Sequence, residues 1–78
     1  MQFTNKFGQF VKVVKNPKSW RYSYSVRAHY REGKKWYGPL IASQHKTKKA
    51  AEAAARTLRN KDVLVVLGWD TRRKNITG

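Results

Sequence analysis

The segment SWRYSYSVRAHYR, residues 19 to 31, alternates large apolar side chains with polar or cationic ones almost without interruption. A period of two residues is typical of a β-strand that buries one face and leaves the other in water. The sequence therefore predicts a strand over residues 20 to 31. The parity expected to face the core holds Trp20, Tyr22, Tyr24, Val26, Ala28 and Tyr30.

Residues 10 to 15 (FVKVVK) predict an earlier strand, because β-branched side chains predominate there. Val13 and Val14 are adjacent, so we expect either a bulge or burial on both faces of the sheet. The tetrapeptide NPKS, residues 16 to 19, predicts a turn between the two strands, since asparagine suits its first position and proline presets φ at its second.

A third strand is predicted over residues 34 to 41, after a reversal at Glu32 and Gly33 where glycine tolerates a positive φ. The dipeptide Gly38-Pro39 interrupts this strand. Because proline lacks an amide donor, the strand is expected to lie at a sheet edge or to bend at that point.

Residues 47 to 59 (TKKAAEAAARTLR) carry the strong helix pattern of the chain. Thr47 is a favourable N-cap, alanine is the best helix former, and Asn60 suits the end of the helix. Small side chains recur at the spacing of one helix face, which lets the helix axis approach a sheet closely. That face holds Ala51, Ala54, Ala55 and Leu58.

The apolar run VLVVL, residues 63 to 67, is short and β-branched, which favours a fourth strand over a helical continuation. The predicted fold class is α+β: a three-stranded antiparallel meander packed on one helix, with a short fourth strand, in the order β-β-β-α-β. Residues 1 to 69 are expected to form a single small domain, and residues 70 to 78 a flexible basic tail. The helix covers the aromatic face of the meander, so the other face is exposed.

The large positive net charge of the chain indicates an anionic partner. Eighteen lysines and arginines oppose four acidic residues, a formal net charge of +14. Self-repulsion on this scale is relieved by a polyanion, of which nucleic acid is the commonest; an anionic membrane surface or an acidic protein is the alternative. The chain has no cysteine, no apolar stretch long enough to span a membrane and no signal-peptide pattern, so we expect a cytoplasmic protein, nucleoid-associated or in a host cell.

Catalytic chemistry is not indicated. The four carboxylates, at positions 32, 52, 62 and 70, are not placed for paired acid–base work. His29 and His45 are 16 positions apart and lack the spacing of a metal motif, and no glycine-rich phosphate loop is present. The sequence predicts a non-enzymatic protein without a metal or other cofactor.

The exposed parity of the central strand is the candidate binding site. Residues i and i+2 lie about 6.8 Å apart along a strand, close to two base-pair steps of B-form DNA, and the major groove admits a two-stranded β-ribbon. Solvation of an ordinary strand face is the alternative, and the aromatic parity could instead stack single-stranded bases. The candidate residues are Arg21, Ser23, Ser25, Arg27, His29 and Arg31, extended on the third strand by Lys35 and Tyr37.

Two further basic clusters are candidates for phosphate contacts. One lies at the predicted helix N-terminus, where cations oppose the helix dipole, so a purely structural role would cost stability. The other lies in the expected tail and would add non-specific attraction. The first holds Lys46, Lys48 and Lys49, and the second holds Arg72, Arg73 and Lys74.

The segment WRYSYSVRAHYREGKKWYG followed by HKTKKAAEAAARTL, within residues 20 to 59, resembles the arm-type N-terminal DNA-binding domain of tyrosine integrases. The resemblance implies a three-stranded sheet presented to the major groove and backed by one helix. It implies DNA contacts from the same exposed parity and from the next strand. The run at residues 63 to 67 is extra to that pattern and would complete the sheet or form a dimer contact.

Two other classes compete with that assignment. KTKKAAEAAARTL is also similar to the final helix of double-stranded RNA-binding domains, although the helix that precedes the strands in that family has no counterpart here. A small basic protein of this kind could also be a phage-type inhibitor that docks on an acidic groove of a host nucleic-acid-processing protein. We expect double-stranded DNA binding through the exposed basic face of the sheet.

Overall fold

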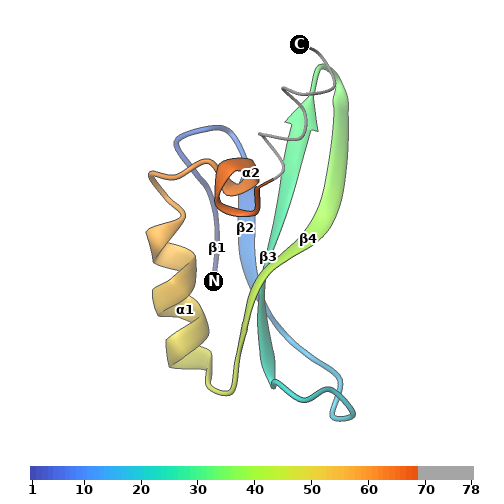
Figure 1. Ribbon diagram of the computed structural model, residues 1–78, viewed down its shortest axis with the longest axis vertical. Helices are drawn as coiled ribbons and strands as arrows, with labels where there is room; N and C mark the ends of the chain where they lie inside the picture. The colour runs from blue at the N-terminus through green and yellow to red at the C-terminus, as the bar shows by residue number, and fades with distance from the viewer. Residues whose placement is uncertain (69–78) are drawn as a thin grey trace.

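The computed structural model describes residues 1 to 68, which form a four-stranded antiparallel sheet with two helices on one side (Figure 1). The strand order across the sheet follows the chain, β1-β2-β3-β4. This arrangement confirms the predicted α+β class. The elements are β1 (Gln2–Thr4), β2 (Phe10–Lys15), β3 (Tyr24–Glu32), β4 (Lys35–His45), α1 (Lys48–Thr57) and α2 (Val63–Val66).

β2 has the predicted bounds, but β3 begins four residues later than predicted. The last pair between them is Lys15 with Tyr24. The same register would place Tyr22 opposite Pro17, which has no amide hydrogen to donate. Residues 16 to 23 therefore form a loop instead of extending the ladder. The β2–β3 pairing has no bulge, and Val13 and Val14 are both half-buried, so the two-sided alternative for β2 is the one observed.

β3 and β4 form a long hairpin whose turn is one residue later than predicted. Glu32 pairs with Lys35, so the two-residue loop is Gly33-Lys34, with Gly33 at a φ of 62°. β4 continues to His45, four residues beyond the predicted end, and lies at the sheet edge as its proline led us to expect. The register shifts twice along this pair, and the hairpin extends well past both helices (Figure 1).

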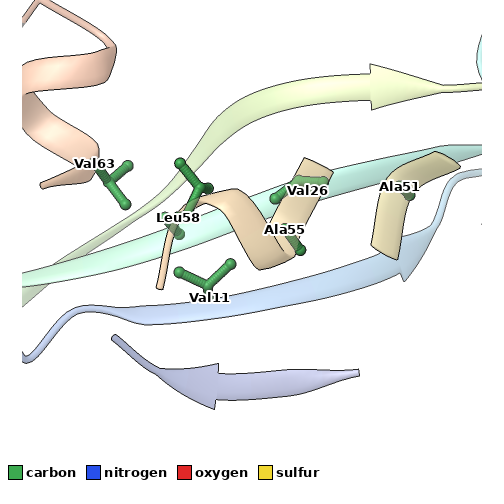
Figure 2. Packing of buried hydrophobic residues seen from close by; sticks show 7 residues of the cluster. Val11, Val26, Ala51, Ala55, Leu58 and Val63 are labelled. Carbon is green, nitrogen blue, oxygen red and sulfur yellow. The ribbon is translucent and has the colours of Figure 1, made fainter. Parts of the chain in front are cut away.

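α1 follows the predicted pattern closely. Thr47 caps it, its hydroxyl accepting a 3.2 Å hydrogen bond from the amide of Ala50. Ala51 and Ala55 are fully buried against the sheet, where Val11 and Val26 meet them (Figure 2). Because alanine has only a methyl group, the helix backbone lies close to the strands, and the core between them is aliphatic.

The predicted aromatic core is only partly present. Val26 and Ala28 are buried and Tyr24 packs at the margin, whereas Trp20 lies outside β3 and is 39% exposed. A ten-residue helix is about 15 Å long, enough to cover four or five residues of a strand. Tyr30 extends past that cover and stacks on a tyrosine of β4 instead.

The predicted fourth strand over residues 63 to 67 is wrong, because this run forms the short helix α2. Asp62 caps it, its carboxylate accepting a 2.9 Å hydrogen bond from the amide of Leu64. Val63 and Leu64 are buried whereas the next two valines are exposed. The fourth strand is β1, whose Phe3 pairs with Val11 and packs on the core. Within the described residues, no helix has the length and apolar character needed to cross a membrane.

A buried amide network joins the β1–β2 loop to the connection between the helices. The Asn5 side-chain amide donates to the carbonyl oxygens of Leu58, at 3.1 Å, and Lys61, at 3.0 Å. Gln9 accepts from the amide of Val63 at 2.9 Å and donates to the Asp62 carboxylate at 2.7 Å. These contacts hold α2 against the same side of the sheet as α1.

Candidate nucleic-acid interface

The sheet has one face under the helices and one face, here called the open face, on the opposite side (Figure 1). Direct cross-strand partners point to the same side, so the register assigns each residue to a face. Val11 and Val26 point to the helices, and the residues alternating with them point away. The open face holds Gln2, Thr4, Phe10, Lys12, Val14, Ser25, Arg27, His29, Arg31, Trp36, Ile41 and Gln44.

The centre of the open face is cationic. Lys12 lies directly opposite Arg27 in the β2–β3 register, an arrangement in which like charges repel. The Arg27 guanidinium lies over the Trp20 ring, 5.6 Å from its centroid, and its buried Nε has no hydrogen-bond partner. A guanidinium positioned by an aromatic ring and beside a second cation is well placed to bind an anion.

Arg31 continues the positive charge toward the tip of the hairpin. It is exposed, and its Nε donates a 2.7 Å hydrogen bond to the carbonyl oxygen of Gly33. Its cross-strand neighbour is Trp36, which is 52% exposed. Arg27 and Arg31 are four residues apart on one strand, about 13 to 14 Å.

Between these cations the open face is hollowed and aromatic. An open hollow of about 380 Å³ is lined by one residue from each strand: Thr4, Phe10, His29 and Trp36. The Phe10 and His29 rings are tilted, with centroids 6.1 Å apart. Gly38 lies behind His29: a Cβ there would be 2.8 Å from the Ala28 oxygen and 3.0 Å from Nδ1 of His29. The glycine therefore makes room for the histidine ring.

The strand register places no carboxylate of residues 1 to 68 on the open face. Within residues 1 to 68 the acidic residues are Glu32, Glu52 and Asp62. Glu32 shares the helix-side parity of Tyr30, Glu52 belongs to α1, and Asp62 caps α2. In the same part of the chain, no group of three histidine or acidic side chains is positioned to hold a metal ion.

The structure brings together three of the predicted site residues, Arg27, His29 and Arg31, along β3. Ser25 has the same parity but is fully buried, and its hydroxyl donates a 2.7 Å hydrogen bond to Asn16, so it serves the loop. Arg21 and Ser23 lie in that loop before β3 and are both exposed.

The prediction that Lys35 and Tyr37 extend this surface is wrong. Tyr37 stacks on Tyr30, with centroids 5.3 Å apart and ring planes 19° apart, on the helix-side parity of the hairpin. Lys35 shares that parity, because Trp36 is the residue opposite Arg31. The place of the turn does not explain the error. A two-residue loop at Glu32-Gly33 would also put Lys35 and Tyr37 opposite the helix-side parity of β3, and only a different loop length exchanges the faces.

The remaining predicted clusters lie away from the open face or outside the described residues. Lys46, Lys48 and Lys49 are exposed around the start of α1, on the covered side. Arg72, Arg73 and Lys74 fall beyond residue 68. Sequence reasoning missed Thr4, Phe10 and Trp36. A two-residue turn, whether at Glu32-Gly33 or at Gly33-Lys34, assigns Trp36 to the face of His29 and Arg31.

Comparison with known proteins adds no relative. The chain matches no protein-family model, no curated protein and no solved structure.

Proposed function

We propose that this chain binds double-stranded DNA through the open face of its sheet. The observation that carries the proposal is the row of cations Lys12, Arg27 and Arg31 on a face that carries no carboxylate of the described residues and lies opposite both helices. Clustered positive charge attracts a polyanion, and a net charge of +14 strengthens that attraction at long range.

The dimensions of the face agree with a duplex partner. Arg27 and Arg31 are about 13 to 14 Å apart along β3, close to four base-pair steps at about 3.4 Å each. The major groove is about 12 Å wide and accepts a two-stranded ribbon such as the projecting β3–β4 hairpin. The likeness to arm-type integrase domains implies the same use of the sheet.

Arg27 and Lys12 are the expected phosphate contacts near the middle of the sheet, because an anion between them would relieve their repulsion. Arg31 is exposed near the tip of the hairpin, and arginine can pair bidentately with a guanine edge, so it is the expected base-edge contact. Lys46, Lys48 and Lys49 contribute to the long-range field rather than to this contact surface.

The experiment compares two single-charge changes on one hairpin. Arg31→Ala removes a cation from the open face, and Lys35→Ala removes one from the opposite parity. We expect Arg31→Ala to weaken binding to a 20-base-pair duplex about tenfold, as for the loss of a charge-assisted hydrogen bond, while Lys35→Ala changes it less than about twofold. Equal losses for the two variants would contradict a role for the open face.

The competing partners are separate outcomes of the same measurement. Affinities for duplex DNA, single-stranded DNA and duplex RNA are compared at one salt concentration. Tighter binding to duplex RNA would replace the proposal with a double-stranded RNA-binding module, since A-form RNA is recognised by shape and 2′-hydroxyls. Failure to bind any nucleic acid would favour an acidic protein partner.

A further inference from the structure

The aromatic hollow of the open face suggests a more specific ligand than a paired duplex. We propose that the hollow receives one unpaired nucleobase, so that the protein prefers DNA containing an unstacked nucleotide. This inference rests on the proposed function, because it assumes that DNA lies on the open face. It adds a binding site, made by Thr4, Phe10, His29 and Trp36, and the chemical class of its occupant.

The lining of the hollow suits the face of a base. Phe10, His29 and Trp36 supply three planar rings, and every nucleobase has a π-face that stacks on such rings. Thr4 and the ring nitrogens of His29 add hydrogen-bonding groups for a base edge. The volume of about 380 Å³ is within the usual range of small-molecule sites and far larger than one thymine methyl group requires.

The charges around the hollow select a nucleotide over a neutral aromatic ligand. His29 lies between Arg27 and Arg31 along β3, about 6.8 Å from each. Lys12 is two residues from Phe10 on β2 and on the same face. A base in the hollow would therefore have its flanking phosphates among cations.

The hollow is built before any ligand arrives. His29 and Phe10 are half-buried, and the absence of a Cβ at Gly38 lets the histidine ring lie close to β4. A preformed site loses little conformational freedom on binding. Trp36 is the one largely exposed ring, so its side chain is the part free to close over a base.

Unpaired bases fit this site better than paired ones. Inside a duplex both faces of a base are covered by its neighbours, and the grooves present only base edges. Access to a base face requires the nucleotide to leave the stack, which costs least where the base is already unpaired. An unpaired base can then stack its face on the aromatic rings that line the hollow.

The test uses three 20-base-pair duplexes of one sequence: fully paired, with one extra unpaired thymidine, and with one extra abasic nucleotide. The abasic duplex has the flexible backbone of the bulge without its base. We expect the thymidine bulge to bind about tenfold tighter than the paired duplex, as for one stacked base, and the abasic bulge to bind like the paired duplex.

Variants of the hairpin locate the effect. Trp36→Ala should remove the preference for the thymidine bulge, and Trp36→Phe should keep most of it. Tyr37→Ala, an aromatic change on the opposite parity, should leave the preference unchanged. Circular dichroism on each variant separates loss of binding from loss of folding.

The outcomes distinguish this inference from the proposed function. Equal affinity for all three duplexes would overturn the base site and leave duplex binding in place. An equal gain for the thymidine and abasic bulges would also overturn it, since backbone flexibility alone would then explain the gain. No binding to any of the three at low salt would overturn the proposed function as well.

Discussion

The hydroxyl of Ser25 donates a 2.7 Å hydrogen bond to the Oδ1 atom of Asn16, and both side chains are buried. The Asn16 amide in turn donates to the carbonyl oxygen of Tyr22 at 2.9 Å, and its backbone amide donates to that of Ser23 at 2.8 Å. These bonds close the β2–β3 loop. Because the loop carries Trp20, they also help to place that ring over Arg27.

Ser25→Ala should destabilise the fold by about 1 to 3 kcal/mol, because it leaves the buried Oδ1 of Asn16 without that donor. Urea unfolding followed by circular dichroism measures the change. Ser23→Ala, at an exposed position two residues earlier, should shift stability by less than about 0.5 kcal/mol. Similar losses for the two serines would show that the buried hydrogen bond is not the cause.

Asn5→Ala should be among the most disruptive polar changes, costing about 2 to 3 kcal/mol. Its amide group donates to two backbone carbonyls and to Gln9, and its oxygen accepts from two backbone amides. Removing it leaves several buried groups unpaired. Asn60→Ala, at an exposed position in the connection after α1, is the control and should be nearly neutral in thermal unfolding.

Ala55→Leu should destabilise the protein by about 1 to 3 kcal/mol through overpacking, since Ala55 is fully buried between α1 and the sheet. Ala53→Leu adds the same atoms to an exposed position of the same helix and should change stability by less than about 0.5 kcal/mol. Denaturant unfolding of the two variants gives the comparison. A lower midpoint for Ala55→Leu than for Ala53→Leu would show that the space between α1 and the sheet cannot take a larger side chain.

Those elements that local chemistry determines could be predicted from the sequence. The β-branched run FVKVVK correctly predicted β2, and the Thr47 cap followed by alanine-rich sequence correctly predicted α1. β1 was missed because three residues are too few to show a period. The wrong prediction for residues 63 to 67 has two causes. The β-branched valines favoured a strand, but Asp62 before them is a helix cap. In addition, β1 occupies the sheet edge beside β2.

The candidate site was predictable where parity alone decides. Arg27, His29 and Arg31 alternate on one strand, so their shared face follows from a period of two. The partners on β4 depended on the length of the loop, because one residue more or fewer in it exchanges Trp36 and Tyr37 between the two faces. The hollow could not be predicted, because its lining comes from all four strands and no local sequence pattern shows how distant strands pair.

Salt dependence should report how many phosphates the protein neutralises. If about six are contacted, the logarithm of the affinity for duplex DNA should fall with the logarithm of salt concentration with a slope near −5. Lys12→Ala should reduce the magnitude of that slope by about 1, because the phosphate contact expected of Lys12 is lost, whereas Lys35→Ala, on the opposite parity, should leave it unchanged. Fluorescence anisotropy of a labelled duplex between 50 and 200 mM salt, roughly the range in which such slopes are resolved, gives both values. A flat response in the unmodified protein would contradict phosphate contacts and point to a protein partner.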